Sequence, residues 1–215
     1  MRLADAYDPV TNPRHLPTVN FASAVDFITG YPFKSAEFFY AGQGVKLCRG
    51  TNVLPAQLDW SDEATWAISD AGRFDRFKII AGDVVIAMDR PWISSGFKIV
   101  LVDHDAPECL LVQRVARLRP KSYFGSNFLY ALFSSDSFKH HCKPTETTVP
   151  HISPNDFRTF PILDPGKEAV AVFDSVAEKV KLQMRRLLGW GACAEGLFAS
   201  LQYRAFSEIS NPRAF

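Results

Sequence analysis

The sequence predicts an α+β protein in which a globular domain over residues 1–165, built on a mixed, barrel-like β-sheet with helices, precedes a long coiled-coil helix over residues 166–209. Two runs of apolar, β-branched residues, Val84–Met88 and Ile99–Val102, are typical of paired strands. Apolar residues return at helical spacing within Asn127–Phe138. Beyond the globular part, apolar or small residues recur at alternating intervals of three and four, the pattern of a helix seam.

Composition places the chain among ordinary globular proteins, because 215 residues with 47% hydrophobic and 22% charged content can bury one core. Membrane helices need about 18 consecutive apolar residues, and no such run occurs. The first residues lack the apolar block of a signal peptide, so we expect a cytoplasmic protein without a membrane partner. The cysteines lack a CxxC pair and are expected to be reduced and mostly buried. They are Cys48, Cys109, Cys142 and Cys193.

The first third of the chain is predicted to alternate irregular segments with short elements. Residues 1–20 contain three prolines and no period, which indicates an irregular arm, and Phe21–Ile28 is a short amphipathic segment. Glycine and proline in Gly30–Ser35 force a turn that projects aromatic and basic side chains. Val45–Arg49 is a predicted strand, and the polar, tryptophan-containing stretch Leu58–Phe77 is a predicted surface loop with a helical turn.

The loop between the two central strands is the candidate functional tip of the domain. Residues 89–98 combine acidic, basic, aromatic and hydroxyl side chains on what should be a rigid strand pair. The alternative is a purely structural hairpin in which Trp92 covers the end of the sheet.

The stretch after the hairpin predicts a strand and then helices. Leu110–Leu118 alternates apolar and polar residues, with Arg117 on the polar face. Arg114 interrupts the alternation, so it needs a sheet edge or an acidic partner, because an unpaired buried cation is costly. Asn127–Phe138 is a predicted core-facing helix, and Ser153 is a candidate cap for a short helical turn.

A single helix is predicted from Glu168 to Phe206, about 58 Å long at ~1.5 Å per residue. Its apolar seam consists of Val170, Phe173, Ala177, Val180, Met184, Leu187, Gly191, Ala194, Phe198, Leu201 and Ala205. Gly189, Gly191 and Gly196 each cost roughly 1 kcal/mol inside a helix. The helix is therefore either held straight there by tertiary contacts or broken into two, and its seam requires a second helix.

Catalytic motifs are missing from the sequence. It contains no Asp-x-Lys or Glu-x-Lys, Walker A, NPP[FY], GxSxG or HExxH pattern. His140, His141 and Cys142 lack a second ligand pair at zinc-finger spacing, which favours a polar helix end over a metal site. Four cations without an acidic residue between Gln113 and Lys121 indicate a nucleic-acid-binding face instead.

Six stretches of the chain resemble the specificity subunits of type I restriction-modification systems, in the order in which that family has them. They are Gly30–Ser35, Arg49–Asn52, Gly82–Val84 continuing to Met88–Trp92, Leu111–Arg119, Val149–Ser153 and Leu197–Phe206. The resemblance implies a target recognition domain that reads one half of a split DNA sequence, followed by a helix that acts as a molecular ruler.

Whole specificity subunits contain two such domains and two antiparallel helices, whereas this chain has one of each, so the resemblance implies a half-subunit. It also implies double-stranded DNA, modification subunits and restriction subunits as partners. S-adenosylmethionine, ATP and Mg²⁺ would be bound by those partners, with no cofactor on this chain. We expect a homodimer through the helix seam that reads a palindromic split site.

Base reading requires side chains that match donors and acceptors in the major groove, while other cations hold phosphates. The candidates for base contacts are Lys34, Arg49, Asn52, Arg90, Trp92, Ser94, Ser95 and Lys98. The candidates for phosphate contacts are Arg117, Arg119 and Lys121.

Two other functions stay open at this point. One is a stand-alone hydrolase that uses Asp83, Asp89 and His104. The other is a protein-interaction adaptor that uses the helix seam and touches no DNA. Salt-dependent binding to duplex DNA distinguishes the adaptor, because phosphate contacts release counterions.

Overall fold

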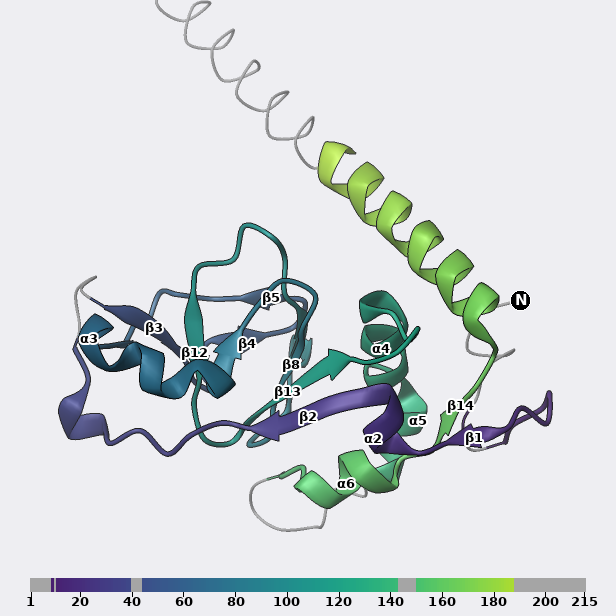
Figure 1. Ribbon diagram of the computed structural model, residues 1–215, viewed down its shortest axis with the longest axis horizontal. Helices are drawn as coiled ribbons and strands as arrows, with labels where there is room; N and C mark the ends of the chain where they lie inside the picture. The colour runs from purple at the N-terminus through teal and green to yellow at the C-terminus, as the bar shows by residue number, and fades with distance from the viewer. Residues whose placement is uncertain (1–8, 10, 40–43, 143–149, 188–215) are drawn as a thin grey trace, which may run out of the picture. The chain divides into compact units, whose positions relative to one another are not determined.

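The computed structural model describes residues 9, 11–39, 44–142 and 150–187 (Figure 1). The chain divides into two units, 1–174 and 175–215, which are considered separately. The named elements of the first unit, in chain order, are β1 (Thr18–Val19), α2 (Phe21–Ala24), β2 (Val25–Thr29), η1 (Ser35–Glu37), β3 (Val45–Cys48), β4 (Val53–Leu54), β5 (Gln57–Leu58), β6 (Thr65–Trp66), α3 (Ile68–Ala71), η2 (Gly72–Phe77), β7 (Lys78–Ile79), β8 (Val84–Ala87), β9 (Trp92–Ile93), β10 (Gly96–Phe97), β11 (Ile99–Leu101), β12 (Cys109–Leu111), β13 (Val115–Pro120), α4 (Ser126–Phe133), α5 (Asp136–His141), α6 (Pro154–Thr159) and β14 (Ile162–Leu163).

The first sheet has four strands in the order β11-β8-β13-β2, and all of its neighbours are antiparallel. The predicted central hairpin is confirmed, because β8 pairs with β11 and places Val85 opposite Val100. These β-branched side chains suit a strand that is buried on both faces. Strand β2 forms one edge of the sheet and, among the strands that the structure describes, pairs with β13 alone.

The second sheet has the order β6-β3-β12-β7 and is mixed, since β3 and β12 are parallel while the other pairs are antiparallel. The predicted strand at Val45–Arg49 corresponds to β3. The prediction of one continuous strand over Leu110–Leu118 is wrong. Arg114 adopts a left-handed conformation with φ of 63°, and the chain there turns out of β12 in the second sheet into β13 in the first.

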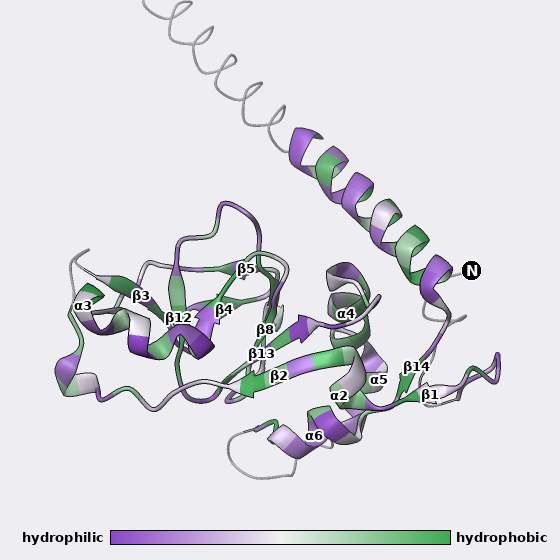
Figure 2. Cartoon of the chain, in the orientation of Figure 1, coloured by the Kyte–Doolittle hydropathy of each residue, from purple (hydrophilic) through white to green (hydrophobic). Residues whose placement is uncertain are grey.

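Two hydrophobic layers cover the two faces of the first sheet. On one face, Val84, Ile86 and Leu118 pack with the aromatic side chains of the helices, including Phe133 and Phe138. The opposite face packs against β3 and β12 of the second sheet. Figure 2 shows the hydrophobic colour on β8 and on part of α4. The α+β class with a mixed sheet is therefore confirmed, and both sheets are open.

The helix predicted over Asn127–Phe138 is two helices, α4 and α5. The first helix ends at Ser134. Ser135 caps the second, because its hydroxyl accepts a hydrogen bond from the Phe138 backbone N–H at 3.2 Å. The prediction of core-facing apolar residues in α4 is confirmed, since its buried residues are Phe128, Leu129, Leu132 and Phe133.

Several shorter predictions are refined by the structure. The arm predicted to be irregular contains β1, which pairs with β14 and places Thr18 opposite Leu163. The stretch predicted as a surface loop includes the edge strand β6, whose Trp66 is buried at 7% exposure. The predicted cap at Ser153 is confirmed, because Ser153 and Asp156 form a reciprocal capping box at the start of α6.

Residues 167–187 are helical, in agreement with the first part of the predicted long helix. Val170, 1% exposed, and Phe173 pack into the core of the first unit, so these two are not free seam residues as predicted. Within the second unit, Val180, Met184 and Leu187 are exposed. The remainder of the predicted seam, including Phe198 and Leu201, lies outside the described residues. Cys48, Cys109 and Cys142 are free and buried, as predicted.

Candidate nucleic-acid interface

The strand directions of the first sheet bring two loops to one of its ends. Strands β2 and β8 are both antiparallel to β13, so they run in the same direction and finish at the same end of the sheet. Strand β8 continues into residues 89–98, β2 continues into Gly30 and Tyr31, and β13 begins there just after Arg114. We call this the loop end of the first sheet.

Residues 89–98 fold into a small second hairpin at the loop end. Strands β9 and β10 pair there, and Trp92 stacks on Phe97 with ring centroids 5.4 Å apart. Trp92 is half-buried against the core, while Arg90, Ser94 and Ser95 are exposed. Both interpretations of this loop therefore hold in part: Trp92 covers the sheet, and the residues on either side of it present a cation and two hydroxyl groups.

An ionic cluster that joins three segments holds the base of this loop. The Asp89 carboxylate forms an ion pair with Arg114 and lies 2.8 Å from His151 Nδ1. Burial raises the pKa of Asp89, but hydrogen bonds from Arg114 and His151 outweigh it, so the pKa is lowered overall. Arg90 N–H also donates to the Pro150 carbonyl at 3.0 Å. The off-pattern Arg114 was the sequence signal for this cluster, and the acidic partner it required is Asp89.

Two of the candidate base-reading residues are buried and form hydrogen bonds inside the protein. Lys98 is 8% exposed and donates its ammonium to the Gly50 carbonyl. Asn52 is 1% exposed, and its Nδ2 donates to the carbonyls of Asp59 and Asp62 at 2.9 and 2.8 Å. Arg49 completes this network through Asp62, with Nη2 at 3.0 Å from the carboxylate. These residues hold the 49–62 loop in place beside the hairpin.

The candidate phosphate-binding residues follow β13 toward the opposite end of the sheet. From Val115 to Pro120 the strand rises about 17 Å at ~3.3 Å per residue. The expectation that Arg117 lies on the polar face is wrong, because it is 3% exposed and pairs with Asp26 at 2.7 Å. Arg119 forms two hydrogen bonds, of 2.7 and 2.9 Å, with the buried Asp83 carboxylate. Lys121 is exposed and donates to a carbonyl of α2 at 2.7 Å.

Lys34 is placed apart from the other candidates, at the start of η1. Its side chain is 81% exposed and lies 3.7 Å from Glu37. It follows Tyr31 and Phe33, which pack against Phe74 in an aromatic cluster with centroid distances of 4.9 and 4.8 Å. The predicted turn that projects a basic side chain is thus present, with its aromatic residues packed together.

The structure does not bring together the residues of the hydrolase alternative. Asp83 and Asp89 lie at opposite ends of β8, about 20 Å apart at ~3.3 Å per residue. His104 is exposed in the turn after β11. Among the described residues, no group of three or more His, Cys, Asp or Glu side chains is arranged to hold a metal ion. His141, from the histidine pair considered above, lies 3.0 Å from Thr159 Oγ1.

These features define the class of protein: an α+β binding module that presents an exposed cation and hydroxyl groups from a braced loop at one end of a sheet. The part of the chain that the structure describes contains no helix long and apolar enough to cross a membrane.

The comparisons with known proteins identify the relatives of this module. The chain is 28% identical over 183 residues to the type I restriction enzyme EcoAI specificity subunit of Escherichia coli, covering 83% of this chain and 31% of the relative. It is 32% identical over 129 residues to the type I restriction enzyme MjaVIII specificity subunit of Methanocaldococcus jannaschii, covering 59% of this chain and 30% of that one. The chain therefore spans about a third of the length of these relatives. No protein-family model matches it.

Solved structures show the same fold. A structure described as the basis of complex assembly and conformational transition of the type I R-M system aligns with a TM-score of 0.53 at 15% identity, covering 96% of this chain and 51% of that chain. The HsdS subunit from Thermoanaerobacter tengcongensis aligns with a TM-score of 0.51 at 16% identity, covering 81% and 39%. The resemblance to type I specificity subunits is confirmed.

Proposed function

We propose that this chain is a DNA-reading half of a type I specificity subunit, which recognises one part of a bipartite DNA target and docks modification subunits. The observation that carries the proposal is the loop end of the first sheet, in a chain whose curated relatives are specificity subunits. Arg90, Ser94 and Ser95 are exposed there on a loop that a hairpin and an ionic cluster hold in place.

The chemistry of these groups suits base edges in the major groove. Arginine pairs with two acceptors of guanine, and a serine hydroxyl both donates and accepts. A guanidinium on a braced loop loses less entropy on binding than one on a mobile segment. Lys98 ties the reading loop, residues 89–98, to the Gly50 carbonyl, and Asn52 and Arg49 hold the neighbouring 49–62 loop. We assign these three residues a supporting role and not direct base contacts.

The proposal makes the chain non-catalytic. Methyl transfer would belong to modification subunits that bind S-adenosylmethionine, and cleavage to restriction subunits that use ATP and Mg²⁺. The exposed side chains of Val180, Met184 and Leu187, at 48, 57 and 66%, support pairing of the helix with that of a second copy. A two-fold dimer would present two identical loops to a palindromic split target.

Selection of duplexes with randomised positions by the full chain, alone and with modification subunits added, tests this function. We expect enrichment of a split motif whose two halves are inverted repeats. Arg90→Ala should relax the preference at one base pair of each half. Arg73→Ala is the matched control, because Arg73 is exposed on η2 and pairs with Asp70. If no motif is enriched and binding to duplex DNA does not depend on salt, the result would favour the protein-interaction adaptor.

A further inference from the structure

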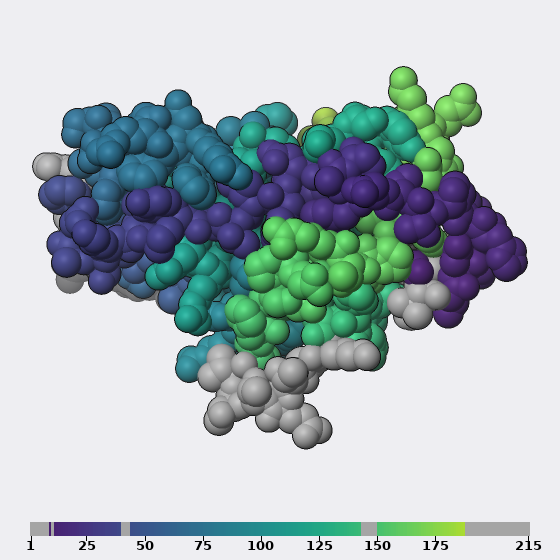
Figure 3. Space-filling model, turned by 60° about the horizontal axis from the view of Figure 1, so that its bottom comes forward, coloured from purple at the N-terminus to yellow at the C-terminus, as the bar shows by residue number. Residues whose placement is uncertain are grey.

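A cleft of about 400 Å³ follows the open edge of β2, between η2 and α6. Its described lining includes Arg76, Arg158, Tyr31 and Phe77, and it includes no aspartate or glutamate. Figure 3 shows the two borders of this region as neighbouring surfaces, the purple of the β2 segment against the green of residues 150–160. The cleft reaches Gly30 and Tyr31, so one of its ends is at the loop end of the first sheet.

The backbone of β2 supplies hydrogen-bond donors to this edge. Gly30 N–H donates to the Val115 carbonyl at 3.0 Å, and the Ala24 carbonyl accepts from Lys121 N–H at 2.9 Å. Residues of an antiparallel strand alternate between bonding to the neighbour and pointing away from it. Because Ala24 and Gly30 both bond at the two ends of β13, the backbone groups of the even-numbered residues of β2 face β13 and those of the odd-numbered residues face away from it. The N–H groups of Phe27 and Thr29 therefore point toward the open side, where the cleft lies.

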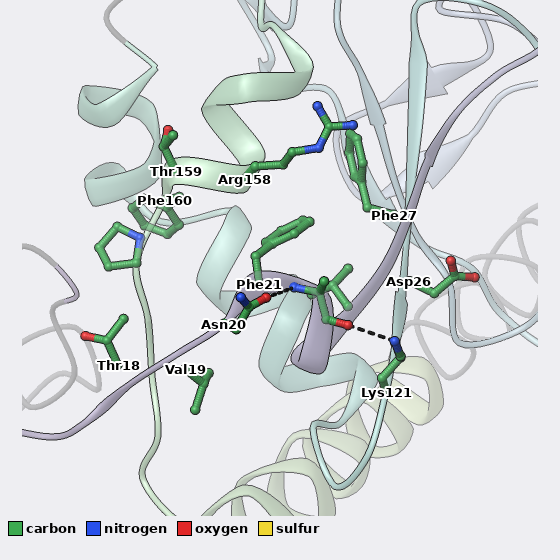
Figure 4. Close-up of a pocket in the computed structure, with 13 residues that line it drawn as sticks. Thr18, Val19, Asn20, Phe21, Asp26, Phe27, Lys121, Arg158, Thr159 and Phe160 are labelled. Carbon is green, nitrogen blue, oxygen red and sulfur yellow. Dashed lines mark hydrogen bonds between the residues drawn. The ribbon is translucent and has the colours of Figure 1, made fainter.

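Two arginine side chains are exposed at the cleft. The Arg158 guanidinium of α6 lies over the Phe27 ring, with its Cζ 5.4 Å from the ring centroid (Figure 4). It has no ion pair with a described residue. Asp156, the acidic residue of the same helix, is already engaged by the backbone N–H of Ser153 at 2.7 Å. Arg76 is exposed as well and has no ion pair within the described part of the chain. The cleft thus presents backbone N–H donors and two guanidinium groups, and its described lining contains no acidic side chain.

A second cleft continues this surface along β2. It has a volume of about 660 Å³ and shares Phe27 and Arg158 with the first. Lys121 contributes a further cation to its lining (Figure 4). Asp26 is its only acidic lining residue among those described, and the Asp26 carboxylate is paired with Arg117 at 2.7 Å. Cations therefore accompany the open edge of β2 for its whole length.

We propose that the cleft of Arg76 and Arg158 binds a phosphate group of the DNA backbone beside the bases that the loop end reads. This inference rests on the proposed function. Guanidinium groups and backbone N–H groups are the donors that proteins use on phosphate oxygens, and such contacts fix the register of the protein on the duplex. Arg158 and Arg76 would hold the backbone, while Arg90 reads bases.

The test compares the full chain with Arg158→Gln, Arg76→Gln and the double variant in binding a fluorescent random-sequence duplex across a series of KCl concentrations. Each phosphate contact contributes about 0.9 to the slope of log K against log salt. We expect that slope to fall by about 0.9 in the double variant, which removes both guanidinium donors from the phosphate, and by no more than that in either single variant, with several-fold weaker binding. Arg73→Gln, on η2 but outside the cleft lining, should keep the wild-type slope. Thermal unfolding verifies that each variant is folded.

The outcomes separate this inference from the proposed function. A wild-type slope in the folded double variant overturns the phosphate site and leaves the proposed function standing. Wild-type protein that binds no duplex at low salt overturns both. Equal loss of slope in Arg73→Gln also overturns the site, because it would show a diffuse charge effect instead of a located contact.

Discussion

His151 Nδ1 lies 2.8 Å from a carboxylate oxygen of Asp89, and the second oxygen of that carboxylate pairs with Arg114. The contact joins three segments that are remote in sequence at the loop end of the first sheet. Because Arg90 follows Asp89 directly, this carboxylate sets the position of the exposed arginine as well as the stability of the loop.

The lowered pKa of Asp89 predicts a specific pH dependence of stability. Burial raises the pKa, the hydrogen bonds from Arg114 and His151 lower it further than burial raises it, and the net direction is down. A carboxyl group with a depressed folded-state pKa stabilises the protein above its unfolded pKa, about 3.9, and loses this contribution as the pH falls through the folded value.

Asp89→Asn should therefore cost at most about 1 kcal/mol near neutral pH, because the cluster is partly exposed. The difference from wild type should shrink below about pH 4. Urea unfolding at several pH values measures both, with Asp70→Asn as a surface-pair control. A difference in unfolding free energy between wild type and Asp89→Asn that stays constant down to about pH 2 would contradict a stabilising role of the ionised Asp89 carboxylate.

Arg119 is predicted to act as a structural residue. Arg119→Gln removes two hydrogen bonds from the Asp83 carboxylate, which is fully buried. The carboxylate then keeps the hydrogen bond that it accepts from the Ile80 N–H at 2.8 Å, without the Arg119 guanidinium beside it. Removing one partner of a buried pair costs about 3–5 kcal/mol, and the partial exposure of Arg119 places the expected loss near 2–3 kcal/mol. Urea unfolding checks this, with Lys121→Gln as the exposed control. A phosphate role for Arg119 would instead lower the salt slope of DNA binding with stability unchanged.

Gly30 is predicted to be intolerant of a side chain because of where the two sheets meet. A Cβ atom at this position would overlap the Val112 carbonyl and lie 2.6 Å from the Leu111 carbonyl oxygen. Backbone atoms cannot move aside cheaply, so Gly30→Ala should destabilise the chain by about 2–4 kcal/mol. Gly50→Ala is the matched control, since a Cβ there meets nothing within 4 Å. Equal unfolding midpoints of the two variants would contradict this account.

Arg90 is predicted to affect recognition without affecting folding. Its side chain is exposed, so Arg90→Ala should leave the free energy of unfolding within about 0.5 kcal/mol of wild type. Each good base contact contributes about 1–3 kcal/mol of discrimination, and the variant should lose that amount between the selected duplex and one with a single substituted base pair. Unchanged discrimination between the two duplexes would show that Arg90 does not contact a base.

Local patterns in the sequence were sufficient for the central hairpin, the core face of α4 and the cap of α6, because each depends on residues within a few positions. They failed at Leu110–Leu118, where the left-handed turn at Arg114 carries no glycine or proline to mark it. Arg114 interrupts the alternation at this turn, but an interruption alone does not reveal that the chain passes from one sheet to the other.

The candidate site was predictable only in part for a similar reason. Arg90 and the two serines are exposed as a polar loop should be, whereas Arg117 and Lys98 are buried. Their internal partners are 91 and 48 positions away in sequence, at Asp26 and Gly50. A cation with a distant partner has the same local sequence as a free one. The cleft along β2 was missed because Arg76 and Arg158 come together only through the fold.

The helix is predicted to associate with a second copy through the apolar side chains that follow residue 174. Val180 and Leu187 are 48 and 66% exposed, so each chain gains by burying them against another helix. The variant Val180→Glu with Leu187→Glu should sediment as a monomer where wild type sediments as a dimer, with the thermal unfolding midpoint of the first unit unchanged. Lys179→Glu, at an exposed polar position of the same helix, controls for added charge and should remain dimeric. A monomeric wild type at the highest soluble concentration would contradict self-pairing, because the apolar seam of the helix would then require a different helical partner.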